Sequence, residues 1–152
     1  MLCKSRSLVA EVSGLCRRMS GVARSAELDP VQEALLAEPC ILVDTEDRVL
    51  GSASKRACHA LPRGGSAPLH RAFSLFVFNA RSELLLQRRS DTKITFPGLW
   101  TNTCCSHPLA VPAELEEAGQ LGARTAAQRR LELELGVPHS EAAVENIQFV
   151  TR

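Results

Sequence analysis

The sequence predicts an α+β fold or an α/β/α sandwich, in a single domain. The chain has 152 residues, of which 45% are apolar and 23% charged, which is ordinary for a globular domain. Hydrophobic patterning gives the order β-β-β-β-α-β, with a long loop before the helix. This order favours helices packed on a sheet.

The first part of the body predicts a short helix and a β-hairpin. Asp29 and Pro30 predict a helix start, and VQEALLAE continues the helix for one or two turns. The apolar run CILVD and the segment VLGSAS, separated by TEDR, predict two paired strands. Residues 57–69 hold two prolines and two glycines, which predict a loop.

The centre of the chain predicts two further strands and a short extended segment. HRAFSLFVFN, residues 70–79, is nearly continuous in apolar character, as expected of a strand buried on both faces. ARSE predicts a turn, after which LLLQRR returns as a second strand. SDTKITFPGLW predicts a loop, and TNTCCSHP predicts an extended segment that Pro108 ends.

The last third of the chain predicts one main helix. Residues 111–121 are polar and predict irregular structure, whereas residues 123–135 carry apolar side chains at helical spacing. The side chains expected to face the core are Ala123, Ala127, Leu131 and Leu135. Gly136 predicts the end of the helix, and ENIQFVTR predicts a final strand.

Residues 1–28 differ in composition from the body, residues 29–152. Residues 1–26 carry five basic side chains and one acidic side chain, and they are rich in serine. This composition is typical of a mitochondrial transit peptide, and Leu8, Val12, Leu15 and Met19 would share one helical face. A disordered tail fits the composition equally well, so both interpretations stay open.

Composition argues against several classes of function. The formal net charge of +1 disfavours a general nucleic-acid binder, and no apolar run approaches the roughly 20 residues of a membrane span. The six cysteines include no C-x-x-C pair, so a zinc finger is not expected. We expect reduced thiols in an intracellular protein.

Two groups of charged residues are candidates for binding an anionic substrate. Arg130 and Glu134 lie four residues apart on the predicted helix, beside its core face, although a surface ion pair is the commoner arrangement. Arg88, Arg89 and Lys93 lie at a strand end and in the loop after it. Basic side chains converging on a loop suit phosphate or diphosphate, and solubility is the alternative.

Histidines and cysteines supply the candidate catalytic chemistry. His59, His70 and His107 lie at strand ends or in loops, where a metal site can be assembled, but their spacing fits no short metal motif. Cys105, near a cationic site, could act as an acid or base; a small buried side chain is the alternative. Cys104 points to the other face of an extended chain and suits the core.

Four segments of the body match one known family in the family's own order. They are CHALPRGGSAPLHRAFSLFVFN, LLLQRRSDTKITFPGLWTNTCCSHPL, PAELEE and AAQRRLELELG, within a match from about Val31 to Arg152. The chain thereby resembles the type I isopentenyl-diphosphate Δ-isomerases of the Nudix-fold superfamily. The resemblance implies a Nudix-type sandwich with a mixed sheet. RRLELELGV is similar to a Nudix box, but Arg130 and Leu133 replace glutamates of the hydrolases, which disfavours a nucleoside-diphosphate hydrolase.

The resemblance also implies roles for individual residues. Cys105 matches the catalytic cysteine of the family. The residues that match its histidine metal site, which holds a divalent ion (Mg²⁺, Mn²⁺ or Zn²⁺), are His59, His70 and His107. Glu134 matches the glutamate that binds a Mg²⁺ ion bridging to the substrate diphosphate. The implied substrate contacts are Lys55, Arg89, Lys93, Ser106 and Arg130.

The reaction implied by the resemblance is a 1,3-allylic proton shift between isopentenyl and dimethylallyl diphosphate, in isoprenoid and sterol biosynthesis. One group protonates the double bond, and a group on the opposite face removes a proton from the neighbouring carbon. A fixed diphosphate would position the carbon tail between them, in a pocket that excludes water. The expected partner is this small isoprenoid diphosphate, and the expected state is a monomer.

Family chains continue beyond the segment that matches IQFVTR. The resemblance therefore implies a sandwich that is incomplete at its C-terminus, without a Trp-Gly-Glu-His-Glu segment that completes the metal site and supplies the partner of Cys105. An inactive chain that binds diphosphate through Lys55, Arg89 and Lys93 is the alternative to an active isomerase. The family implies a cytoplasmic or peroxisomal location, and residues 1–28 are a candidate mitochondrial address.

Overall fold

The computed structural model describes residues 30–61 and 65–151. The predicted transit peptide or tail lies outside the described residues. The first described elements are α2 (Pro30–Ala37), the strands β1 (Pro39–Val43) and β2 (Val49–Ser54), and the short helix α3 (Lys55–His59). The predicted helix start and the predicted antiparallel hairpin are both confirmed.

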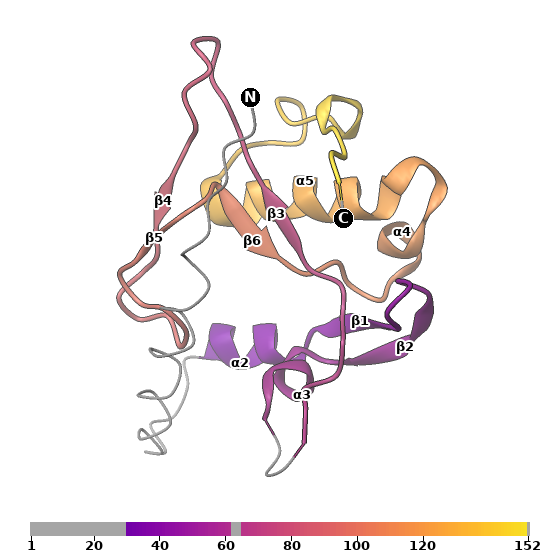
Figure 1. Ribbon diagram of the computed structural model, residues 1–152. Coiled ribbons are helices and arrows are strands. Elements are labelled where there is room, and N and C mark those ends of the chain that lie inside the picture. Colours follow the sequence, from indigo (N-terminus) through magenta and orange to yellow (C-terminus); the bar gives the residue numbers. More distant parts are fainter. Residues whose placement is uncertain (1–29, 62–64, 152) are drawn as a thin grey trace, which may run out of the picture.

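The β1–β2 hairpin packs against α3 (Figure 1). Cys40 and Ile41 of β1 are fully buried. The Ser54 hydroxyl accepts a hydrogen bond of 3.2 Å from the Ala57 amide and so caps the start of α3. This cap fixes the short helix whose last residue is His59.

The remaining strands are short and pair in an antiparallel manner. β3 (Phe73–Leu75) pairs with β6 (Cys104–Ser106), and β4 (Gln87–Arg88) pairs with β5 (Trp100–Thr101). Isolated bridges join Cys40 to Leu109 and Leu42 to His70. Within the described residues the strands thus form three antiparallel pairs in place of the single mixed sheet expected, and the α+β class is confirmed.

The central strand is shorter and less buried than the sequence predicts. From Phe73 to Phe78 the side chains alternate between half-buried and exposed positions, so the prediction of burial on both faces is wrong. Phe76 is 52% exposed and Phe78 is 59% exposed. The reason is that α5 (Leu121–Leu135) packs against β3 and β6 from one side only (Figure 1).

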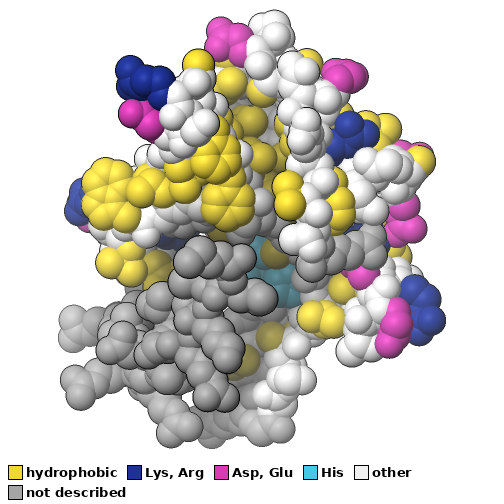
Figure 2. All heavy atoms as spheres, turned by 45° about the horizontal axis from the view of Figure 1, so that its top comes forward, with side chains coloured by type: hydrophobic (Ala, Val, Ile, Leu, Met, Phe, Trp, Pro, Cys, Tyr) yellow, Lys and Arg dark blue, Asp and Glu magenta, His cyan; other side chains and the backbone are white. Residues whose placement is uncertain are grey.

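The exposed side of β3 and β6 continues across the segment 84–88 and β5. Phe78 bridges Leu84, and Arg88 pairs with Trp100, so their side chains share one face. We call this surface the outward face; its exposed residues are Ser74, Phe76, Phe78, Leu84, Leu86, Arg88, Trp100 and Cys105. Figure 2 shows hydrophobic side chains gathered over one side of the molecule, with histidine side chains visible near the middle of the view.

The C-terminal third contains more helix than expected and lacks the predicted strand. Residues 111–121 hold α4 (Pro112–Leu115) and the 3₁₀ helix η1 (Ala118–Gln120). The predicted final strand is replaced by the 3₁₀ helix η2 (Val144–Asn146) and irregular chain up to residue 151. Gly136, at a φ of 68°, ends α5 as predicted.

The buried side of α5 is rotated relative to the prediction. Ala127 and Leu131 are buried as expected, but Ala123 and Leu135 are only half-buried. Gly122, Ala126 and Arg130 are buried as well. The rotation follows from a close approach of α4, because a Cβ on Gly122 would lie 2.2 Å from the Glu114 carbonyl oxygen.

Candidate active site

Three histidines from separate parts of the chain converge in the structure. His59 ends α3, His70 precedes β3 and His107 follows β6. One ring nitrogen from each lies within 4.8 Å of those of the other two. The ring centroids are separated by 4.9 to 5.1 Å. Three imidazoles at this spacing form a donor set suited to a divalent transition metal ion.

Hydrogen bonds fix the tautomers of two of these histidines. His59 Nδ1 lies 2.8 Å from the Lys55 carbonyl oxygen, and His70 Nδ1 lies 2.8 Å from the Pro68 carbonyl oxygen. A carbonyl oxygen only accepts, so each Nδ1 carries the hydrogen and each Nε2 keeps a free lone pair. This is the usual arrangement of a histidine prepared to bind a metal.

The third histidine, His107, has a buried ring nitrogen that is available to bind a metal ion. Within the described residues, Nδ1 of His107 is buried and lacks a hydrogen-bond partner. Burial, followed by the positive charge of Lys55 and the neighbouring histidines, lowers the pKa of His107 to about 3. His107 is therefore neutral at physiological pH, the form that coordinates a metal. The cluster fits a divalent ion on this ground.

A second, charged group lies beside the histidines. Arg130, only 5% exposed, donates from Nε to Glu134 at 3.1 Å, and Gln87 donates to the other carboxylate oxygen at 3.2 Å. Burial raises the pKa of the Glu134 carboxyl, but these hydrogen bonds outweigh burial and the net pKa lies below its usual value. Glu134 is thus an anion held between neutral and cationic donors.

Two lysines complete this charged group. Burial lowers the pKa of Lys55; the carboxylate of Glu38 opposes this change, whereas the positive charges of Arg130 and Lys93 add to it. Lys93 also acts on the carboxylate of Glu134. The predicted residues Lys55, Lys93, Arg130 and Glu134 are therefore close enough to influence each other electrostatically, as an anion-binding group requires.

Arg89 organises the loop that carries Lys93. Its guanidinium donates to the carbonyl oxygens of Thr95 and Phe96, at 2.8 to 3.1 Å. Phe96 has a φ of 50°, which is uncommon for an aromatic residue, so the bonds from Arg89 hold a strained turn in place. Arg88 points outward and pairs with the exposed Asp91 at 2.9 Å.

The two adjacent cysteines of β6 lie on opposite sides of the strand, as predicted. Cys104 is fully buried toward α5, and burial, with the nearby carboxylate of Glu134, raises its pKa to about 12. Cys105 is exposed on the outward face opposite Ser74. Ser106 is buried, on the side of Cys104 and away from that of Cys105.

Sequence reasoning missed the polar neighbours of Cys105. Its Sγ lies 3.1 Å from Asn102 Oδ1 and 3.2 Å from Ser74 Oγ. Asn102 precedes the cysteine by three residues within TNTCCSHP, so the motif contained it. Ser74 could be found only through the β3–β6 register, which the sequence does not specify.

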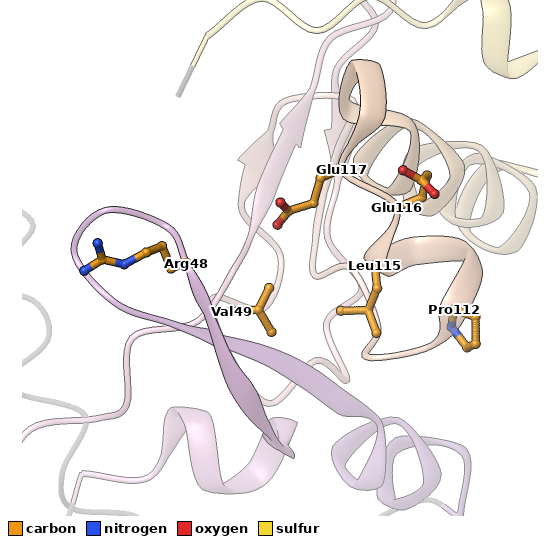
Figure 3. Close-up of a pocket in the computed structure, with 6 residues that line it drawn as sticks. All are labelled: Arg48, Val49, Pro112, Leu115, Glu116 and Glu117. Carbon is orange, nitrogen blue, oxygen red and sulfur yellow. The ribbon is translucent and has the colours of Figure 1, made fainter.

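A separate hollow of about 620 Å³ lies between the β1–β2 hairpin and α4 (Figure 3). Its lining residues are Arg48, Val49, Pro112, Leu115, Glu116 and Glu117. Arg48 pairs with Asp44 and Glu46, and Glu117 pairs with Arg71. None of the predicted site residues lines this hollow, so it is distinct from the histidine cluster and Cys105.

Comparison with known proteins assigns the family. The model of the NUDIX domain matches residues 68–152, which is more than half of the chain. The chain belongs to the Nudix family. The matched part of this Nudix chain includes Cys105, two histidines of the cluster and the whole of α5.

Curated relatives of this Nudix chain carry one name. It is 56% identical over 126 residues to isopentenyl-diphosphate Delta-isomerase 1 of Bos taurus, covering 83% of this chain and 56% of the relative. It is 52% identical over 134 residues to isopentenyl-diphosphate Delta-isomerase I of Camptotheca acuminata, covering 87% and 56%. For the isopentenyl-diphosphate delta-isomerase of Candida albicans the identity is 42% over 160 residues, covering 93% and 56%.

This Nudix chain spans about half the length of the curated relatives it matches. The resemblance seen in the sequence is confirmed at the level of the family. The longest described helix, α5, has 15 residues, and within the described ranges no helix is long and apolar enough to cross a bilayer.

Proposed function

We propose that the protein is an isopentenyl-diphosphate Δ-isomerase, which converts isopentenyl diphosphate into dimethylallyl diphosphate. The observation that carries the proposal is the convergence of His59, His70 and His107. His107 follows Cys105, an exposed cysteine on an apolar face, by two residues. The names of the relatives, all isomerases of this substrate, support the same reaction.

Cys105 is the proposed proton-transfer residue. An unactivated alkene is a very weak base, so its protonation requires a well-placed acid in a site from which water is excluded. The Cys105 thiol lies on the outward face, whose side chains are mainly apolar and suited to a five-carbon tail. Transfer of the thiol proton to the terminal alkene carbon would leave a tertiary carbocation at the next carbon. A base on the opposite face would then take a proton from the methylene beside that cation, which moves the double bond.

The charged groups are proposed to hold the diphosphate and its metal ions. His59, His70 and His107 would hold one divalent ion (Mg²⁺, Mn²⁺ or Zn²⁺), and Glu134 would hold a Mg²⁺ ion. A bound Mg²⁺ ion would neutralise diphosphate charge that side chains alone would otherwise have to meet. Lys55 and Lys93 would contact the diphosphate oxygens directly. Arg130 would hold Glu134 in place, because its guanidinium is already committed to that carboxylate.

Two of the implied substrate contacts are proposed to act indirectly. Arg89 would act by holding the loop of Lys93, since its hydrogen bonds go to Thr95 and Phe96. Ser106 would act through the packing of β6, since it is buried on the side away from Cys105. A monomeric state and a cytoplasmic or peroxisomal location stay predictions of the resemblance. The mitochondrial address of residues 1–28 stays a prediction from composition, with a disordered tail as its alternative.

The direct test is an assay of the purified protein with isopentenyl diphosphate and Mg²⁺, with the product followed by proton NMR. We expect dimethylallyl diphosphate, and we expect Cys105→Ala to abolish its formation. Ser52→Ala, which changes an exposed residue of β2 that is not among the proposed site residues, is the matched control and should retain full activity.

Three other results would contradict the proposal. Turnover that survives in Cys105→Ala would remove the cysteine from the reaction. Diphosphate binding without turnover would favour an inactive diphosphate-binding chain. Release of inorganic phosphate from nucleoside diphosphate compounds would favour a Nudix hydrolase.

A further inference from the structure

A buried ion pair joins α4 to α5 beside the segment that carries His107. Glu114 of α4 is only 5% exposed, and its two carboxylate oxygens accept from the Arg129 guanidinium of α5 at 2.5 and 3.0 Å. α4 packs against α5, and α5 packs against β6, which ends at Ser106 (Figure 1). A buried carboxylate costs free energy unless it is paired and its remaining lone pairs are used. The further contacts of this pair therefore need an explanation.

Both members of the pair also bond the backbone on either side of Pro108. Glu114 accepts from the Leu109 amide at 2.7 Å, through the oxygen Oε2. Arg129 donates from Nη2 to the His107 carbonyl oxygen at 3.3 Å. Proline has no amide hydrogen to donate. The ion pair thus holds this short backbone segment at both of its ends.

Strand pairing reaches each side of His107 but does not include it. The antiparallel pairing of β3 with β6 ends with Phe73 opposite Ser106. Within the described residues, the chain next pairs with a strand at the isolated bridge of Leu109 to Cys40. His107 therefore lies at the point where the chain leaves β6, and the ion pair is the charged contact that holds its backbone there.

The ring of His107 depends on its backbone more than the other two rings do. Nδ1 of His59 and Nδ1 of His70 each bond a backbone carbonyl oxygen at 2.8 Å, which fixes both rings directly. Within the described residues, Nδ1 of His107 is buried and has no such partner. The position of this third ring is therefore set by the backbone that carries it, which the pair of Glu114 and Arg129 holds.

We propose that Glu114 and Arg129 are positioning residues for the histidine cluster, which hold the His107 backbone so that its ring reaches the same ion as the other two rings. Neither side chain belongs to the cluster, so both act through His107 and do not bind the ion themselves. Hydrogen bonds behind a ligand orient it for the metal. The proposal rests on the proposed function in one respect, that the three histidines hold a divalent ion.

The test is the affinity of the purified chain for Co²⁺ alone, followed by the visible absorption of the bound ion. Replacing one member of the pair would leave a buried charge unpaired, so both are replaced in the double variant Glu114→Met, Arg129→Met. We expect this variant to bind Co²⁺ about tenfold more weakly, as is typical when the support of a metal ligand is lost. Its Co²⁺ spectrum should move toward that of His107→Ala, because the ion loses the same ligand.

Two comparisons separate positioning of His107 from a general loosening of the fold. In a chain that already carries His107→Ala, the double variant should change the affinity by less than about twofold, because the residue that the pair positions is gone. Glu116→Met is the matched control, since Glu116 is an exposed carboxylate near α4 that accepts from the Ala118 amide at 2.9 Å. This variant should keep the Co²⁺ affinity of the unaltered chain.

The outcomes separate this proposal from the proposed function. An unchanged Co²⁺ affinity in the double variant, or an equal loss with and without His107, would overturn the positioning role. The measurement needs no turnover, so the expected pattern in a chain that does not isomerise would support the positioning role and contradict the proposed function. An isomerising chain without this pattern would overturn the positioning role alone. A chain that binds no Co²⁺ at the cluster would overturn the metal site and the positioning role together.

Discussion

His59 and His70 each donate through Nδ1 to a backbone carbonyl, which leaves Nε2 of both rings with a free lone pair. The sequence predicts these residues and His107 at strand ends or in loops, whereas His59 ends the helix α3. Their convergence depends on long-range pairing. The bridge of Leu42 to His70 and the β3–β6 pair bring distant segments together. No local pattern specifies such pairing, so at the residue scale the members of the cluster are predictable and their geometry is not.

If the three histidines bind one metal ion, replacing any one of them should weaken the binding of that ion. Isothermal titration with Mn²⁺ or Zn²⁺ should show one ion bound per chain, and His59→Ala should weaken binding by at least about tenfold, because three ligands become two. His139→Ala is the matched control, since His139 is an exposed histidine that pairs with Glu132 outside the cluster. Equal losses in both variants would show that the ion binds elsewhere.

At the element scale, the sequence predicts the bounds of α5 well. It does not predict how the strands and α4 pack around this helix. Helical spacing and the glycine stop place the helix correctly, because both signals are local. The apolar run 70–79 looks the same whether one face or two faces are covered, so the sequence could not show that α5 covers only one. The packing of α4 on Gly122 likewise becomes visible only in three dimensions.

Gly122 predicts a steric limit between α4 and α5. Alanine at this position would place Cβ 2.2 Å from a backbone oxygen of α4, which cannot rotate away. We expect Gly122→Ala to lower the free energy of unfolding by about 2 kcal/mol, although alanine favours helix, with urea denaturation as the measurement. The matched control is Leu133→Ala on the exposed side of α5, which should change the free energy little. A stabilised Gly122→Ala variant would contradict this packing.

At the scale of the whole molecule, an exposed apolar surface lies beside the Cys105 thiol. Large apolar side chains of the outward face are about half exposed or more, including Phe76, Phe78 and Trp100. Surfaces of this kind in folded domains usually bind another molecule or another part of the chain. The sequence predicts the fold class correctly, but not this surface, because exposure depends on which elements pack where.

The outward face predicts strong binding of a hydrophobic dye by this chain. The fluorescence of 8-anilinonaphthalene-1-sulfonate should rise with the chain and fall markedly in the double variant Phe76→Ser, Phe78→Ser. Leu50→Ser is the matched control, because Leu50 is 68% exposed on β2, away from this face. A dye signal that falls equally in both variants would place the dye elsewhere.

We propose that a proton moves through the sulfur of Cys105 onto an isoprenoid diphosphate. The decisive experiment is incubation with isopentenyl diphosphate and Mg²⁺ in D₂O, followed by mass spectrometry of the recovered diphosphates, because solvent-derived deuterium marks each protonated carbon. We predict deuterium in the recovered isoprenoid with the unaltered chain and with Ser52→Ala, and none with Cys105→Ala. Equal incorporation in the presence and absence of the Cys105 thiol, or none in the unaltered chain, would show that Cys105 does not transfer this proton.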